Sequence, residues 1–268
     1  YSYNPASDPA NAALGAGATR NVVINYTVTD DQGATASSTL TITVTGTNGA
    51  PVATDDVSSG SEGSTIAGSV AGNDTDPDGD SLTYSLNGSV AGLTLNADGS
   101  YSFDASNSAY NSLGVGQSQV IVAGYTVSDG SLSDVGQLTI TITGTNDGPV
   151  AQADTNSGLE GGAAVTGSVA GNDSDIDANA VLSYSTSGTV PLGFSLNADG
   201  SYSYNPASDP ANAALGAGAT RNVVINYTVT DDQGATASST LTITVTGTNG
   251  APVAVDDVSS GAEGSTIA

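Results

Sequence analysis

The chain has 268 residues, of which 27 are acidic and two, Arg20 and Arg221, are basic, so its formal net charge is -25. This charge excludes nucleic acid and anionic lipid surfaces as expected partners, because both are bound through clusters of lysine and arginine, and no apolar run is long enough for direct membrane insertion. The absence of cysteine and histidine removes disulfides, thiolate metal sites and the commonest general base, and leaves oxygen atoms as the available metal ligands.

The first predicted elements are two strands joined by a turn. Residues 21–29 and 38–45 alternate apolar with polar side chains, the period of a half-buried strand, and Asp30-Asp31-Gln32-Gly33 between them predicts a hairpin turn. Residues 93–95 and 100–103 flank Asn96-Ala97-Asp98-Gly99 and predict a second hairpin. Since no segment shows sustained helical periodicity, the pattern predicts an all-β fold of antiparallel β-sandwiches.

The sequence repeats itself on two scales. Residues 1–67 recur at 202–268, a period of 201 residues, with only Thr54/Val255 and Ser61/Ala262 differing. A linker that begins Thr-Asn occurs at 47–53, at 145–151 and at 248–254. The long period therefore holds two modules of about 100 residues, a normal size for a β-sandwich domain and far too long for one coil of a β-solenoid.

This periodicity divides the chain into four segments. Residues 1–47 are the C-terminal part of a repeat, 48–145 and 146–248 are complete repeats, and 249–268 are the N-terminal part of the next repeat. The two end segments cannot complete each other, because both lack the stretch matching Gly68 to about Ser100. Each is therefore expected either to be completed by sequence beyond this chain or to stay poorly folded. Three tyrosines at equivalent strand positions are predicted to be core or tyrosine-corner residues: Tyr26, Tyr125 and Tyr227.

The acidic residues are expected to avoid the strands, and three of the places where they occur recur along the chain. Glutamate occurs only at Glu62, Glu160 and Glu263, each time before glycine at the same repeat position. A second cluster spans residues 73–80 and recurs at 172–177, and a third position follows the Tyr-x-Val strand at Asp30, Asp129 and Asp231. Carboxylates 4–5 Å apart repel by roughly 3–4 kcal/mol at an effective dielectric near 20, which indicates a bound cation, with a solvated acidic turn as the alternative.

Calcium is the cation that this oxygen-rich chemistry favours. Asp-x-Asp-x-Asp-Gly at residues 74–79 resembles the opening of an EF-hand loop, but the twelfth position is Ser85 instead of glutamate and no helices flank the loop. The sequence thus predicts Ca²⁺ binding without an EF-hand.

The linker Thr-Asn-Asp-Gly-Pro, the Glu-Gly position and the run Gly-Asn-Asp-Thr-Asp-Pro-Asp-Gly-Asp-Ser-Leu-Thr-Tyr-Ser-Leu together resemble VCBS, or cadherin-like, repeats of giant bacterial RTX adhesins secreted by type I systems. The resemblance covers the whole chain. It implies tandem immunoglobulin/cadherin-like Greek-key sandwiches in an elongated array, which act as non-enzymatic extenders at the surface of a Gram-negative bacterium and support cell adhesion and biofilm formation. The implied partners are the neighbouring repeats of the same chain.

The resemblance to animal cadherins also implies where Ca²⁺ would bind, between successive repeats. Carried across by motif, the candidate ligands are Asn48, Glu62, Asp74, Asp76, Asp78, Asp104, Asp129, Asn146, Asp147, Glu160, Asp173, Asp175, Asp231 and Asn249. Gly49 and Gly250 replace the linker aspartate that Asp147 supplies, and Asn205 replaces Asp104, so those sites are expected to bind fewer ions or to bind them more weakly. In an alternative arrangement, Asp78, Asp80 and Asp177 close a site within their own loop.

Three other functions compete with the adhesin extender. A self-assembling extracellular filament or surface layer would use lateral or end-to-end contacts between copies, through unpaired sheet edges. A carbohydrate- or ligand-binding module is disfavoured because the repeated tyrosines are expected in the core. An enzyme that hydrolyses glycosides through paired carboxylates is disfavoured because the acids lie in repeated turns.

Overall fold

A computed structural model describes residues 1–252, 254–264 and 266. The chain divides into two compact units, Tyr1–Asn146 and Asp147–Ala268. Within these residues nearly all of the regular structure is β, and the exceptions are three short 3₁₀ turns, at Pro5–Ser7 (η1), Pro9–Asn11 (η2) and Pro206–Ser208 (η3). Among the described residues, no helix has both the length and the apolar composition that crossing a bilayer requires.

The first unit contains one β-sandwich and a separate hairpin. The hairpin consists of β1 (Thr19–Thr29) and β2 (Thr35–Thr45). The larger sheet of the sandwich has the order β3-β9-β8-β5 and the smaller has the order β4-β7-β6. The bounds are β3 Asp56–Ser61, β4 Thr65–Ser69, β5 Thr83–Leu86, β6 Leu93–Leu95, β7 Ser100–Asp104, β8 Ser118–Ser128 and β9 Ser133–Thr143.

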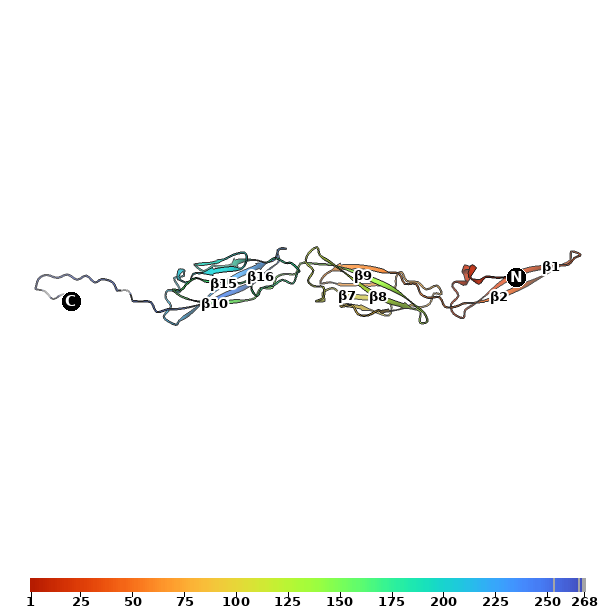
Figure 1. Cartoon of the computed structure of the whole chain (residues 1–268), viewed down its shortest axis with the longest axis horizontal. Helices are drawn as coiled ribbons and strands as arrows, with labels where there is room; N and C mark the ends of the chain where they lie inside the picture. Colours follow the sequence, from red (N-terminus) through yellow and green to blue (C-terminus); the bar gives the residue numbers. More distant parts are fainter. Residues whose placement is uncertain (253, 265, 267–268) are drawn as a thin grey trace. The chain divides into compact units, whose positions relative to one another are not determined.

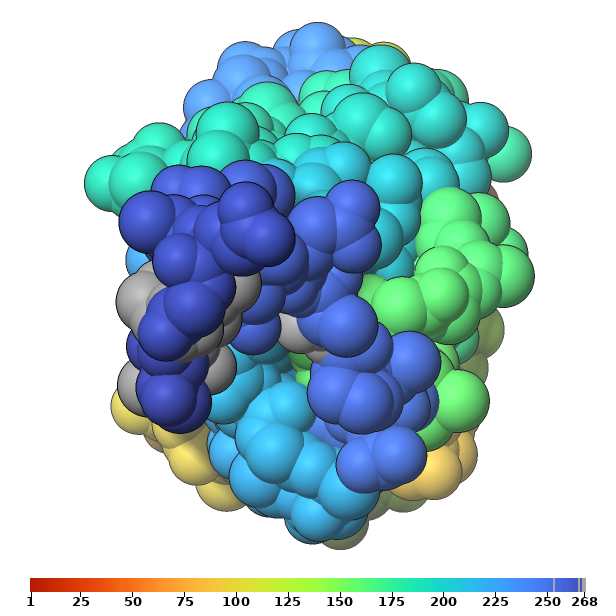
Figure 2. All heavy atoms as spheres, turned by 90° about the vertical axis from the view of Figure 1, so that its left-hand side faces the viewer, coloured from red at the N-terminus to blue at the C-terminus, as the bar shows by residue number. Residues whose placement is uncertain are grey.

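The second unit repeats this sandwich with a different sequence. Its larger sheet has the order β10-β16-β15-β12, of which three strands are labelled in Figure 1, and its smaller sheet has the order β11-β14-β13. The bounds are β10 Asp154–Leu159, β11 Val165–Ser168, β12 Ser183–Ser187, β13 Phe194–Leu196, β14 Ser201–Tyr204, β15 Thr220–Thr230 and β16 Thr236–Thr246. The described residues after β16 belong to no strand or helix, and Figure 2 shows this segment end-on in dark blue.

The core of each sandwich follows from the alternation along its long strands. In β9, Leu138, Ile140 and Ile142 point inward and are at most 3% exposed, while the two threonines between them face outward with intermediate exposure. The same pattern places Leu241, Ile243 and Val245 in the second core. Burial of these aliphatic side chains, at about 1.5–3 kcal/mol each, holds the two sheets together.

The predicted hairpin at residues 93–103 is confirmed as the pair β6–β7, and β13 and β14 form the equivalent pair in the second module. In the first, Asn96 donates its backbone N–H to the carbonyl of Ser100 at 2.8 Å, and Gly99 donates to the carbonyl of Asn96 at 3.0 Å. Gly99 has φ +83°, and a Cβ there would lie 2.7 Å from the Cβ of Ala71. Glycine is therefore required for both the turn and the close packing.

The all-β sandwich prediction is confirmed, with one difference in strand direction. β3 runs parallel to β9, and β10 runs parallel to β16, whereas the remaining strand pairs in the two larger sheets are antiparallel. In each module the first strand joins the edge of the larger sheet alongside the last strand. Each larger sheet is therefore mixed, not purely antiparallel.

The tyrosine prediction is correct for two of the three residues. Tyr125 and Tyr227 are each 1% exposed, and their hydroxyls lie 3.0 Å and 2.6 Å from the backbone carbonyls of Thr54 and Gln152. For Tyr26 the prediction was wrong, because its side chain is 46% exposed. The β1–β2 hairpin forms a two-stranded sheet of its own, with no further strand paired to it among the described residues.

Candidate metal centre

The acidic loop that follows β4 brings three carboxylates together. One ligand oxygen from each of Asp76, Asp78 and Asp80 lies within 4.8 Å of the other two. Asp76 Oδ1 accepts the backbone N–H of Asp78 at 2.8 Å and that of Asp80 at 3.3 Å, so the first carboxylate shapes the loop. Its other oxygen, Oδ2, is buried and accepts no hydrogen bond from the residues that the structure describes.

The linker that precedes this module is bound to the same loop. Gly49 donates its backbone N–H to Asp78 Oδ2 at 2.7 Å, and Asn48 Nδ2 donates to Asp129 Oδ2 at 2.9 Å. The backbone N–H groups of Leu132 and Ser131 lower the pKa of Asp129, and the Asn48 amide lowers it further. Linker, acidic loop and the end of β8 therefore converge around the carboxylates of Asp78 and Asp129.

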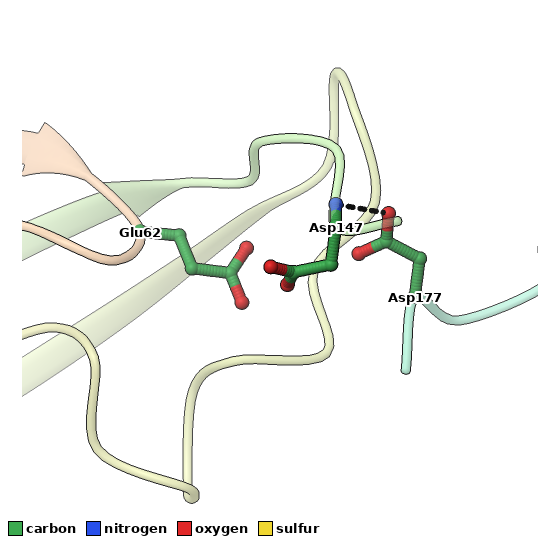
Figure 3. Close-up of side chains that lie close together, drawn as sticks. All are labelled: Glu62, Asp147 and Asp177. Atoms are coloured by element: carbon green, nitrogen blue, oxygen red, sulfur yellow. Dashed lines mark hydrogen bonds between the residues drawn. The ribbon is translucent and has the colours of Figure 1, made fainter. Parts of the chain in front are cut away.

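The second unit builds the equivalent arrangement from Asp147, Asp175 and Asp177. Figure 3 shows the backbone N–H of Asp147 donating to Asp177 Oδ2, a hydrogen bond of 3.0 Å. Asp177 in turn donates its N–H to Asp175 Oδ1 at 2.9 Å. Asp175 Oδ2 and Asp177 Oδ1 are both buried and lack hydrogen-bond partners among the described residues.

Electrostatics at this second cluster oppose the charged state of Asp177. Asp177 is buried, with 8% of its surface exposed. Burial raises the pKa of Asp177, and the negative charges of Asp147, Asp175 and Asp231 raise it further, although the N–H of Asp147 acts in the opposite direction. Buried carboxylates without donors are unfavourable unless a proton or a cation compensates them.

These donor sets fit calcium. Every available ligand is a carboxylate, amide or carbonyl oxygen, and Ca²⁺ takes six to eight such oxygens in flexible geometry. The orphaned oxygens of Asp76, Asp175 and Asp177 recur in two modules whose loop sequences differ. A cation at each cluster would satisfy these atoms and cancel the repulsion that the sequence predicts.

The glutamates lie where each module ends. In the first module, Glu62 accepts the backbone N–H of Thr145 at 3.3 Å and that of Leu113 at 3.4 Å, and it is 5% exposed. In the second module, Glu160 accepts the N–H of Thr248 at 3.2 Å. Each glutamate thus contacts the residue directly before a linker asparagine, Asn146 or Asn249.

Some residues in the predicted ligand set are engaged elsewhere. Asp74 accepts the N–H of Thr54 at 2.7 Å and lies 3.5 Å from the Tyr125 hydroxyl, and Asp173 has the equivalent contacts with Gln152 and Tyr227. Asp104 is exposed and accepts both the N–H and the hydroxyl of Ser106. As metal ligands, the geometry therefore favours Asp76 and Asp78 over Asp74 in the first module. In the second module it favours Asp175 and Asp177 over Asp173.

The remaining predicted positions lie at the module ends. Asp231 is 5% exposed, and its Oδ1 accepts the N–H groups of Gln233 and Ala235. Asn249 is exposed, in the segment after β16.

Asp177 was not among the principal candidates from sequence, although its position two residues after Asp175 matches that of Asp78 after Asp76.

Asp177→Asn is expected to raise the melting temperature of the calcium-free second module at neutral pH. The folded-state pKa of Asp177 lies above its unfolded value, so this carboxylate favours folding only at low pH and opposes it once the pH exceeds the raised pKa. Asparagine removes the charge and keeps an oxygen for the N–H of Asp147. The measurement is thermal unfolding by circular dichroism in EDTA.

Asp199→Asn provides the matched control for this substitution. Hydrogen bonds from Ser201 lower the pKa of Asp199, so the same loss of charge should reduce stability at neutral pH. A lower melting temperature for Asp177→Asn would contradict the unfavourable electrostatics inferred here.

Comparison with known proteins shows that one family model matches both complete modules. The family model described as the bacterial cadherin-like domain matches residues 48–144 and 146–247. No match is found among curated proteins.

Solved structures that match this chain include cadherin ectodomains. Mouse cadherin-23 EC22-24 is 17% identical, with 85% of this chain and 74% of that chain covered and a TM-score of 0.49. The human desmocollin-1 ectodomain is 13% identical, with 85% and 47% covered and a TM-score of 0.45. An endo-fucoidan hydrolase from glycoside hydrolase family 107 is 19% identical, with 84% and 34% covered and a TM-score of 0.32. This chain spans about half or less of the length of the latter two.

Proposed function

Because the chain belongs to the bacterial cadherin-like domain family, we propose that it supplies structural extender repeats of a large secreted adhesin on the surface of a Gram-negative bacterium. Domains of this family are typically extracellular adhesion or extender modules and are generally non-enzymatic. In the proposed role, the repeats hold a binding region away from the cell and thereby support cell adhesion and biofilm formation.

Calcium is the proposed structural ion of these repeats. The observation that carries this proposal is the set of buried, unpartnered carboxylate oxygens on Asp76, Asp175 and Asp177. In the first unit, Asp76 and Asp78 would hold the ion together with Asp129 and the linker residue Asn48. In the second unit, the corresponding residues are Asp147, Asp175, Asp177 and Asp231.

The proposed consequence of calcium binding is a stiffer linker. Asn48 and Gly49 are already hydrogen bonded to Asp129 and Asp78, and an ion shared by these carboxylates would restrict the linker further. The family resemblance adds the glutamate of each repeat, such as Glu160, as a ligand at the linker that follows it. Calcium would thus join neighbouring repeats of the same chain, its proposed partners, into a semi-rigid rod.

Small-angle X-ray scattering tests the proposal. With millimolar Ca²⁺ the maximum dimension should increase and the distribution of distances should narrow relative to EDTA, because an ordered linker samples fewer angles. Equimolar Mg²⁺ should have little effect, since Mg²⁺ requires near-ideal octahedral geometry and retains its waters. Asp76→Asn combined with Asp175→Asn should abolish the calcium response, whereas Asp98→Asn combined with Asp199→Asn, in the hairpin turns, should retain it. Identical scattering in Ca²⁺ and EDTA would refute calcium-dependent stiffening.

The same measurement separates an extender from a filament. An extender keeps a fixed length as protein concentration rises, whereas a self-assembling filament grows. Concentration-independent scattering in Ca²⁺ is the expected result.

A further inference from the structure

The linker before the first complete module contains a dipeptide with its own chemistry. Asn-Gly occurs three times in the chain, at Asn48–Gly49, Asn87–Gly88 and Asn249–Gly250. In such a dipeptide the backbone nitrogen of glycine loses its proton and attacks Cγ of the asparagine side chain, and the side-chain nitrogen leaves as ammonia. Water then opens the cyclic succinimide to aspartate or isoaspartate. Glycine permits this ring closure because it has no Cβ to obstruct the approach.

At Asn48–Gly49 the structure restrains both reacting groups. The attacking nitrogen, Gly49 N, donates its hydrogen to Asp78 Oδ2 at 2.7 Å. The leaving nitrogen, Asn48 Nδ2, donates to Asp129 Oδ2 at 2.9 Å and to the Gly49 carbonyl at 2.9 Å. Both groups are partly buried.

These contacts oppose the reaction for two physical reasons. A hydrogen bond from Gly49 to a charged acceptor must break before the nitrogen can attack, and such bonds are among the stronger ones in proteins. The nitrogen must also become an anion, which the adjacent negative charges of Asp78 and Asp129 disfavour. We propose that Asn48–Gly49 is a site of spontaneous deamidation, and that the carboxylate of Asp78 suppresses the reaction by holding the backbone N–H of Gly49 in a hydrogen bond.

The protection would preserve the linker. Deamidation replaces the amide donor of Asn48 by a carboxylate facing Asp129, so an attractive contact becomes a repulsion. Isoaspartate would also insert an extra methylene into the linker backbone. In addition to its proposed place in the calcium site, Asp78 would protect the chemical integrity of the linker, and this second role does not depend on calcium.

The chain supplies its own comparators. Asn249–Gly250 lies in the same Thr-Asn-Gly-Ala-Pro sequence as Asn48–Gly49, but both of its residues are exposed. Asn87–Gly88 lies in the same module as Asn48, outside the linker, where Asn87 Oδ1 accepts the Thr126 hydroxyl at 2.6 Å. The rate of deamidation at Asn87 therefore reports whether the first complete module stays folded.

The test is peptide mapping by mass spectrometry after incubation of the whole chain at neutral pH in EDTA. Peptides must reach residue 54 or 255, because Thr54 and Val255 distinguish the two otherwise identical linkers. In the wild type, Asn48 should deamidate at least about tenfold more slowly than Asn249, the rate factor expected for one charge-assisted hydrogen bond. Asp78→Ala should raise the Asn48 rate about tenfold and leave Asn87 unchanged.

Asp98→Ala is the matched control, since it removes one carboxylate of the same module at a hairpin turn. It should leave the Asn48 rate at the wild-type value. Equal rates at Asn48 and Asn249 in the wild type would overturn the proposal. An Asn48 rate unaffected by Asp78→Ala, or one that rises only together with the Asn87 rate, would also overturn it. Because EDTA is present throughout, these outcomes are independent of the proposed calcium function.

Discussion

Replacing Tyr227 by alanine is expected to destabilise its module by about 3–5 kcal/mol, the usual cost of removing a buried aromatic side chain. Tyr227 is 1% exposed and packs in the core with Tyr184, at a ring-centroid distance of 6.4 Å. Its hydroxyl also lies 2.6 Å from the backbone carbonyl of Gln152 and 2.9 Å from Asp154 Oδ2. The substitution therefore leaves a cavity and removes the donor that ties the start of the module to its core.

The chain contains a matched control for this substitution in Tyr26. Residues 1–47 and 202–248 are identical in sequence, but Tyr26 is 46% exposed on the β1–β2 hairpin. Tyr26→Ala should cost about 1 kcal/mol or less, as is usual for exposed positions. Urea unfolding followed by circular dichroism measures both effects. If both variants lost the same free energy of unfolding, Tyr227 would not be part of a packed sandwich core.

The strands were predictable because their signals are local. Alternation at residues 21–29 and 38–45 predicts β1 and β2 to within a few residues, and Asn-Ala-Asp-Gly predicts the β6–β7 turn. The parallel pairing of β3 with β9 was not predictable, because residues 56–61 carry one large apolar side chain, Val57, and pair with a strand some 80 residues away. Non-local pairing leaves little trace in a short polar segment.

The candidate site was predictable as a loop but not atom by atom. Aspartates alternate through residues 74–80, and nothing in that run shows which carboxylate turns towards the core. The structure directs Asp74 to the Tyr125 hydroxyl and leaves Asp76 Oδ2 without a donor. Asp74 is directed inward by its contact with the Tyr125 hydroxyl. Tyr125 belongs to β8, about 50 residues later in the chain, so this contact cannot be read from the loop sequence.

A partly buried polar network in the second module was also missed. Arg221 donates to Asp209 at 2.7 Å and to Asn212 at 2.6 Å, and Asn212 donates to the Tyr204 hydroxyl at 2.8 Å. A signal was present, because the two arginines of the chain, Arg20 and Arg221, occupy the same repeat position. The first module has Gln119 and Phe103 in place of Arg221 and Tyr204, so the two modules use different chemistry at the same place in the sandwich.

Removing calcium is expected to lower the free energy of unfolding of the modules substantially. A calcium concentration one hundred times the dissociation constant adds about 2.7 kcal/mol to the free energy of unfolding, provided that the unfolded chain does not bind. For modules of about 100 residues, this corresponds to an increase of roughly 10 °C or more in melting temperature. Thermal unfolding by circular dichroism in EDTA and in Ca²⁺ measures the difference.

Two controls assign the stabilisation to specific carboxylates. Sodium chloride at matched ionic strength should reproduce only a small part of it, because salt screens exposed charges much more than buried ones, and Asp177 is 8% exposed. Asp177→Asn should raise the melting temperature in EDTA and reduce the gain on adding Ca²⁺, because one substitution removes both the repulsion and a ligand. If the variant kept the full calcium gain, Asp177 would not be a ligand. If the wild type melted at the same temperature in Ca²⁺ and EDTA, the buried, unpartnered oxygens would have to be compensated by protons, and the proposed stiffening by calcium would lose its physical basis.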